Sequence, residues 1–249
     1  MSSKVYINRT LNMKKISYIG LDMDHTLVRY NSVNFEKLAY KTMLQKLVSQ
    51  KGYPQKVLEL EFNYDDAIRG LVVDKNNGNL LKLSRFGAIR QSRHGTRPIN
   101  YNQQKSFYKS TYIDLGDPEY ISVDTAFSIS YATLYAQLVD FKDLDEEGRL
   151  LPDYHIIADD LNSALDASHR DGSIKQVVAQ NLENYIVKDE ELVEGIIRYQ
   201  KHGKKFFIVT NSDFDYTKLL LDYAINPFLE KGQTWQDLFF LVITTAQKP

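Results

Sequence analysis

The chain has 249 residues, with 31 lysines and arginines against 32 aspartates and glutamates, and it has no cysteine. A net charge of -1 gives no support for binding through overall charge, so neither nucleic acid nor a membrane surface is expected as a partner. The absence of cysteine excludes disulfides and thiolate metal sites. We find no apolar segment of secretory or membrane-spanning length, and we expect a cytoplasmic protein.

The first part of the chain predicts a strand, a helix and a hairpin. The run ISYIGLDM at residues 16–23 is short and apolar, which is typical of buried strands in parallel sheets. Apolar residues then recur at helical spacing over residues 35–51 and stop at Gly52, which predicts a helix with a glycine at its carboxyl end. Residues 70–84 form two β-like runs around the segment NNGN at 76–79, a strong hairpin signal.

The second part predicts mainly helices, followed by two strands. Residues 120–141 are mostly apolar and predict one buried helix of about five turns. Two or three helices are expected between Pro152 and His202. A β-branched and aromatic run, a polar junction and an amphipathic helix follow over residues 204–223. A last apolar strand, DLFFLVITT, leads to Pro249.

This order of elements predicts an α/β fold with an insertion. Helices and strands alternate in the C-terminal part, which predicts a sheet with crossover connections, and the first strand should belong to the same sheet. The hairpin region breaks this alternation, so we expect a large α+β cap inserted into the core. We assign residues 1–30 and 186–249 to the core and residues 31–185 to the cap.

Polar residues follow three predicted core strands. The carboxyl ends of parallel strands meet at one edge of a sheet, where ligands bind. Asp22 and Asp24 follow the first strand, residues 210–212 follow the second, and Lys248 follows the third. Each has a simple structural alternative. The two aspartates can form a turn, and the serine or aspartate of TNSD can cap the following helix. Lys248 can be a solvated surface charge.

Taken together, these residues have the chemistry of a phosphate site. Side chains two apart on a strand point the same way, so Asp22 can attack phosphorus while Asp24 protonates the leaving oxygen and later deprotonates water. Two carboxylates beside a phosphate dianion need a cation, and we expect Mg²⁺, held by Asp22 and the Asp24 backbone carbonyl. The Thr210 hydroxyl and the following backbone amides would hold phosphoryl oxygens, and Lys248 would offset negative charge.

The motifs DMDHTL (22–27), IVTNS (208–212) and the late strand ending in Lys248 resemble motifs I, II and III of haloacid dehalogenase (HAD)-type phosphatases. With RGLVVDKNNGNLLKL, DGSIK and VTNSDFDYTKLLLDY, the chain is similar over residues 16–249 to the cytosolic purine 5'-nucleotidases of that superfamily, the branch that prefers IMP and GMP. The resemblance implies a HAD-like Rossmannoid core and Mg²⁺-dependent hydrolysis of purine nucleoside monophosphates through an aspartyl-phosphate. Because this intermediate is covalent, it can also pass its phosphate to a nucleoside. The resemblance further implies a homo-oligomer.

The resemblance implies roles for the core residues. Asp22 would be the nucleophile and first metal ligand, and Asp24 the acid/base and second ligand. The residues that would hold phosphate are Thr210, Asn211, Ser212 and Lys248. Because no match to the family's fourth, acidic motif is found before Pro249, the resemblance implies a core that lacks its C-terminal part and some metal ligands.

The resemblance also assigns cap residues to the nucleotide. Phe127 would stack on the base, while Asp166 and Lys175 would contact the base and ribose. Asn162 stands where the family often has an arginine, so it can hydrogen-bond a base without supplying charge. The alternatives for Asp166 and Phe127 are an exposed helix position and a core aromatic.

Two other functions remain open from the sequence. The first is a HAD-type phosphatase for another ester, such as a sugar phosphate. The second is a catalytically incomplete chain that binds nucleotides or forms oligomers.

Overall fold

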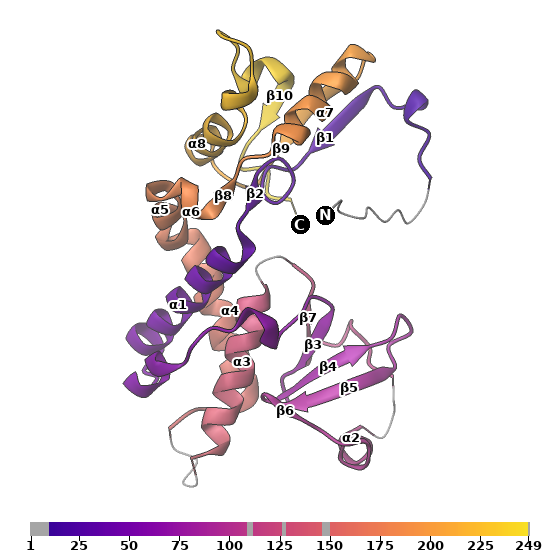
Figure 1. Ribbon diagram of the computed structural model, residues 1–249. Coiled ribbons are helices and arrows are strands. Elements are labelled where there is room, and N and C mark those ends of the chain that lie inside the picture. The colour runs from indigo at the N-terminus through magenta and orange to yellow at the C-terminus, as the bar shows by residue number, and fades with distance from the viewer. Residues whose placement is uncertain (1–9, 109–111, 126–127, 146–149, 249) are drawn as a thin grey trace. The chain divides into compact units, whose positions relative to one another are not determined.

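The computed structural model describes residues 10–108, 112–125, 128–145 and 150–248 (Figure 1). The chain divides into two compact units. The core unit consists of residues 1–30 and 181–249, and the insertion unit consists of residues 31–180.

The core unit contains a parallel sheet of three strands in the order β1–β9–β10. These are β1 (Tyr18–Leu21), β9 (Lys205–Val209) and β10 (Phe239–Ile243). The predicted α/β architecture with a parallel sheet is confirmed, since β9 pairs in parallel with both neighbours. The unit also has a two-stranded antiparallel pair, β2 (Arg29–Tyr30) and β8 (Ile186–Val187).

Within its described residues the core unit has three helices: α6 (Leu182–Tyr185), α7 (Glu190–Lys201) and α8 (Phe214–Ala224). Its single turns of 3₁₀-helix are η1 (Met13–Lys15), η4 (Asn226–Phe228) and η5 (Trp235–Leu238). The amphipathic helix α7 packs against β9, whose Phe206 and Ile208 are buried. The central strand is therefore the best-covered strand of this sheet.

The prediction that the first strand is buried is wrong. No residue of β1 is fully buried, and Tyr18 is 57% exposed. β1 lies at an edge of the sheet, and Tyr18 packs beside Phe240 of β10, with 5.5 Å between the ring centroids. Phe240 is itself 56% exposed, so this aromatic face of the sheet is open to solvent in the described part of the chain.

The insertion unit combines an antiparallel sheet with helices. The strand order is β6–β5–β4–β3–β7. The strands are β3 (Leu71–Asp74), β4 (Asn79–Leu83), β5 (Ile89–His94), β6 (Arg97–Pro98) and β7 (Tyr120–Val123). The helices are α1 (Ser32–Lys51), α2 (Tyr101–Phe107), α3 (Ser128–Asp143), α4 (Tyr154–Arg170) and α5 (Ser173–Gln180), with 3₁₀ turns η2 (Gln55–Glu59) and η3 (Tyr64–Asp66).

Two local predictions for this unit are confirmed. Helix α1 starts after Asn31, whose side chain accepts a hydrogen bond from the N–H of Asn34, and it ends at Gly52 in the left-handed conformation. Strands β3 and β4 pair as the predicted hairpin. The Asp74 carboxylate shapes the turn by accepting hydrogen bonds from the N–H groups of Asn76 and Asn77.

The prediction of one helix over residues 120–141 is wrong in its first part. Residues 120–123 form β7, which pairs antiparallel with β3, and helix α3 begins only at Ser128. A continuous apolar run fits a buried helix and a strand equally well, so hydrophobicity did not mark the change. Between residues 152 and 202, which are all described, the structure has four helices rather than two or three.

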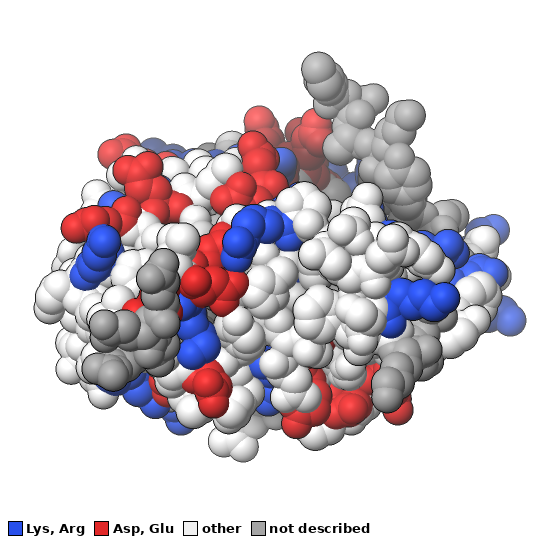
Figure 2. Space-filling model, turned by 90° about the horizontal axis from the view of Figure 1, so that it is seen from below, with Lys and Arg blue, Asp and Glu red and all other residues white. Residues whose placement is uncertain are grey.

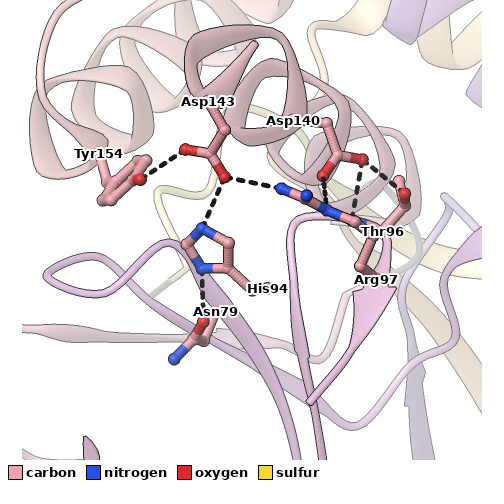
Figure 3. Close-up of polar contacts among 7 residues, drawn as sticks. All are labelled: Asn79, His94, Thr96, Arg97, Asp140, Asp143 and Tyr154. Carbon is pink, nitrogen blue, oxygen red and sulfur yellow. Dashed lines mark hydrogen bonds and ion pairs between the residues drawn. The ribbon is translucent and has the colours of Figure 1, made fainter. Parts of the chain in front are cut away.

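A polar network attaches the β5–β6 turn to helices α3 and α4 (Figure 3). His94 places Nδ1 2.8 Å from Asn79 Oδ1 and Nε2 2.8 Å from Asp143 Oδ2. Asp143 also accepts hydrogen bonds from Arg97 at 2.9 Å and from the Tyr154 hydroxyl at 2.6 Å. One carboxylate of α3 thus receives contacts from β5, β6 and α4.

The charged side chains are mixed in sign over the surface that Figure 2 shows, where lysine and arginine are interspersed with aspartate and glutamate. No helix among the described residues has the length and apolar character needed to cross a membrane.

Candidate active site

The site lies at the carboxyl edge of the parallel sheet in the core unit. Leu21 at the end of β1 is in register with Ile208 of β9, and Ile208 is in register with Val242 of β10. The three strands therefore end at nearly the same level. The loops that follow them carry Asp22 and Asp24, Thr210 to Ser212, and Lys248.

The loop after β1 is a tight turn built around Met23. The Met23 carbonyl accepts hydrogen bonds from the N–H groups of Leu27 at 3.0 Å and Val28 at 2.9 Å, and the Met23 side chain is fully buried. His25 turns the chain with a φ of 56°, a left-handed conformation that is uncommon outside glycine. The turn leaves Asp24 partly exposed and leads into β2.

Asp22 is held through one of its two carboxylate oxygens. Its Oδ1 accepts a hydrogen bond from the Met23 N–H at 2.7 Å and forms an ion pair with Lys248 Nζ at 2.7 Å. Its side chain is 44% exposed. In the described part of the chain no hydrogen bond reaches Oδ2, so this oxygen can approach a phosphorus atom.

Asp24 is held through both oxygens. The Tyr30 hydroxyl donates to Oδ1 at 2.6 Å, and the Ser212 hydroxyl donates to Oδ2 at 3.0 Å. Tyr216 places its hydroxyl 3.4 Å from that of Tyr30. Burial raises the pKa of Tyr30 well above its usual value, and the nearby Asp24 carboxylate adds to this shift. Burial also raises the pKa of Tyr216 to about 12, so both phenols stay protonated near neutral pH.

The segment after β9 is shaped by its own side chains. Thr210 is fully buried, and its hydroxyl oxygen accepts the N–H of Ser212 at 3.1 Å. The sequence left Ser212 or Asp213 as the cap of the next helix. The structure assigns the cap to Asp213, which accepts the Tyr216 N–H at 2.8 Å. This assignment leaves the Ser212 hydroxyl to reach Asp24.

Asn211 and Lys248 join the loops that follow β9 and β10. The Lys248 N–H donates to Asn211 Oδ1 at 2.7 Å, and Asn211 Nδ2 donates to the Lys248 carbonyl at 3.1 Å. Gln247 adopts a φ of 53° just before this pair. The Asn211 amide therefore positions the backbone whose lysine side chain reaches Asp22.

The oxygen atoms present fit a Mg²⁺ ion. Within the described residues, no three histidine, aspartate or glutamate side chains are grouped to hold a metal ion. Mg²⁺ is usually bound through one or two carboxylates, with water and substrate phosphate supplying the other ligands. The Asp22 carboxylate and the backbone carbonyl of Asp24 supply oxygens of this kind.

The cap residues predicted from the sequence lie in the insertion unit. Asn162 and Asp166 are exposed on α4, four residues apart and therefore on the same face of the helix. Lys175 is partly buried on α5. Phe127 lies outside the described residues.

Sequence reasoning missed the two tyrosines beside Asp24. Tyr30 stands in the stretch that directly follows Asp24, but neither its spacing nor its neighbours in the sequence indicate that the chain turns back. Tyr216 has the helical periodicity of a core position in α8 and no other signal. Only the geometry of the His25 turn shows why Tyr30 contacts the carboxylate.

Comparison with known proteins adds the following. The profile of the 5' nucleotidase family matches residues 5–249. A 5'-nucleotidase domain-containing protein of Dictyostelium discoideum is 28% identical over 250 residues, which cover 98% of this chain and 42% of the relative. Human 5'-nucleotidase domain-containing protein 1 is 29% identical over 249 residues, which cover 93% of this chain and 53% of the relative. The chain thus spans about half the length of the curated relatives it matches.

Proposed function

The chain belongs to the 5' nucleotidase family, and from this premise we propose that it hydrolyses purine nucleoside 5'-monophosphates, IMP or GMP, with Mg²⁺. We propose that the core unit is of the HAD type and that Asp22 is the nucleophile. The observation that carries the proposal is the pairing of Asp22 Oδ1 with Lys248, which leaves Oδ2 open beside an acid/base candidate, Asp24.

The first step would form an aspartyl-phosphate. Asp22 Oδ2 attacks phosphorus, and the bond between phosphorus and the nucleoside 5' oxygen breaks. Asp24, which enters this step protonated, gives its proton to that oxygen, and the nucleoside leaves. Lys248 stabilises the negative charge that gathers on the phosphoryl oxygens.

The second step would return the enzyme to its starting state. Asp24, now a carboxylate, takes a proton from a water molecule that attacks phosphorus. The bond between phosphorus and Asp22 breaks, which releases inorganic phosphate and leaves Asp24 protonated. A nucleoside hydroxyl in place of water would give the phosphotransferase reaction.

The metal and the phosphate would be held by neighbouring groups. A bound Mg²⁺, held by Asp22 and the Asp24 carbonyl, would offset the charge of the phosphate and the carboxylates. Thr210, Asn211 and Ser212 follow β9 at the same edge of the sheet, where the Asn211 N–H and the Thr210 hydroxyl would bind phosphoryl oxygens. The N–H groups of Thr210 and Ser212 are already bonded to the Ile243 carbonyl and the Thr210 hydroxyl oxygen.

The insertion unit would select the nucleotide. We propose that Phe127 stacks on the base and that Asp166 accepts hydrogen bonds from the N–H groups of hypoxanthine or guanine. Asn162 and Lys175 would contact the base and the ribose. The support for these four roles is the likeness of the sequence to purine 5'-nucleotidases, together with the exposure of Asn162 and Asp166 on α4.

The test is phosphate release from IMP by the purified chain with Mg²⁺, compared with Asp22→Asn. We expect the variant to lose at least about a thousandfold in kcat, because it lacks the nucleophile. Asp215→Asn, which changes an exposed carboxylate at the start of α8, should keep full activity. Full activity in Asp22→Asn, or no phosphate release from any ester by the unmodified chain, would overturn the proposal. A preference for sugar phosphates over IMP would mean that the substrate is a sugar phosphate rather than a nucleotide.

A further inference from the structure

Tyr30 is buried, yet it directs its hydroxyl at a carboxylate of the proposed site. The residue is 6% exposed, and its hydroxyl donates to Asp24 Oδ1 at 2.6 Å, an ordinary distance for a hydroxyl bound to a carboxylate. A phenylalanine would fill the same space without needing a polar partner. The hydroxyl therefore calls for an explanation beyond packing.

The hydrogen-bond directions around Asp24 follow from the chemistry of its partners. A carboxylate can only accept, so the single Tyr30 proton points to Asp24. The Tyr216 hydroxyl, 3.4 Å from that of Tyr30, is then the donor in the contact between the two phenols.

The two oxygens of Asp24 face hydroxyl groups of different kinds. Oδ1 faces Tyr30, a buried ring whose position is fixed by packing. Oδ2 faces the Ser212 hydroxyl, whose hydrogen can reorient so that the group either donates or accepts. A proton can therefore come and go at Oδ2 without loss of the contact at Oδ1.

We propose that Tyr30 is a positioning residue for the acid/base: it holds Asp24 by Oδ1, so that Oδ2 carries the proton exchanged with the leaving group and with water. The proposal rests on the proposed function, because it assigns a task to the group that protonates the nucleoside oxygen. Tyr216 supports Tyr30 from the side away from Asp24.

The test uses the different proton demand of two leaving groups. A nucleoside 5' oxygen must be protonated as it leaves, whereas p-nitrophenolate leaves without a proton. We expect Tyr30→Phe to lower kcat for IMP by about 10- to 100-fold, which is less than the roughly 10²- to 10⁴-fold that general acid catalysis supplies because Asp24 itself remains, with little change in KM. The first-turnover release of p-nitrophenolate should stay within about twofold of the unmodified chain.

Two matched variants complete the experiment. Tyr223→Phe removes a hydroxyl from a half-buried tyrosine of the same unit whose ring faces Lys188, and it should behave like the unmodified chain. Tyr216→Phe should lower kcat for IMP in the same direction as Tyr30→Phe but by less. If Tyr30→Phe lowered the rate equally for both esters, the hydroxyl would have only a structural role. If it lowered the rate for neither ester, the hydroxyl would have no role in the reaction.

A readout independent of activity separates this proposal from the proposed function. Crystal structures should show one Asp24 side-chain conformation in the unmodified chain and a displaced or mixed conformation in Tyr30→Phe. An unchanged Asp24 would overturn the positioning role. A chain that hydrolyses neither ester would overturn the proposed function, whatever the conformation of Asp24.

Discussion

At the residue scale, the side chain of Glu36 in α1 is buried, and within the described part of the chain only one of its two carboxyl oxygens accepts a hydrogen bond. It is 1% exposed, its Oε2 accepts the Ser130 N–H at 2.8 Å, and its Oε1 has no hydrogen-bond partner among the described residues. Burial raises the pKa of Glu36, and the hydrogen bonds from Ser130 only partly oppose the shift. A raised pKa means that the folded state binds this proton more readily than the unfolded state does.

The pH dependence of stability follows from this shift. The contribution of Glu36 favours folding below its ordinary pKa of 4.5 and is lost as the pH rises through the raised pKa of the folded state. We therefore expect Glu36→Gln to be more stable than the unmodified chain at pH 7, by roughly 1 kcal/mol. The gain should shrink toward zero below pH 4.5.

Urea unfolding at a series of pH values measures this difference. Glu59→Gln, at an exposed position of the same unit, is the control and should change the free energy of unfolding little at any pH. A Glu36→Gln variant that is less stable at pH 7 would contradict the prediction, because it would mean that the ionised carboxylate is favourable where it lies.

Individual residues differ in how far the sequence reveals them. Asp22 and Lys248 could be singled out because each follows an apolar strand, and the structure brings them into an ion pair. Tyr30 could not be singled out, because its contact with Asp24 depends on the left-handed turn at His25. A non-glycine residue with positive φ leaves no reliable mark in a sequence.

At the element scale, the β5–β6 turn approaches helix α3 so closely that it requires a glycine. Gly95 has a φ of 54°, and a Cβ there would overlap the Asp140 carboxylate and lie 2.9 Å from the Ala136 carbonyl. The neighbouring His94 and Arg97 hold the same turn to α3 through Asp143 (Figure 3). The turn has no room to move away without breaking these contacts.

We expect Gly95→Ala to lower the free energy of unfolding by about 2–4 kcal/mol, the sum of backbone strain and overpacking. Gly52→Ala is the matched control, because Gly52 has a similar φ of 74° with nothing within 4 Å of an added Cβ. Its free energy of unfolding should fall only by the backbone strain, about 1–2 kcal/mol. Denaturant unfolding of both variants measures the difference, and equal losses would mean that the turn relaxes away from α3.

Elements that end at a turn or cap residue visible in the sequence were predicted well, and elements without such a residue were not. Helix α1 ends at Gly52 and the β3–β4 hairpin turns at NNGN, both of which are visible in the sequence. The change from β7 to α3 lies within one apolar run, and β7 forms because β3 offers it a pairing edge. Pairing between distant strands is a tertiary property, so it overrides local hydrophobicity.

At the scale of the whole molecule, the core unit is assembled from the two ends of the chain, and the insertion unit is continuous between them. The residues proposed for chemistry all lie in the core unit, in loops fixed by the parallel sheet. The residues proposed to select the nucleotide all lie in the insertion unit. Changes in the two units should therefore affect different kinetic quantities.

The last prediction compares a variant from each unit on two substrates. Asp22→Asn should abolish the hydrolysis of both IMP and p-nitrophenyl phosphate, because every ester needs the nucleophile. Asp166→Ala should raise KM for IMP and GMP about tenfold or more, the loss expected for one hydrogen bond to a charged group. It should leave p-nitrophenyl phosphate unaffected, since that ester has no base to contact. Ser163→Ala, at an exposed position on the same helix, should change neither. If Asp166→Ala instead lowered kcat/KM by the same factor for both esters, the proposed separation of chemistry and substrate selection between the two units would be wrong. The insertion unit would then support the chemistry rather than select the substrate.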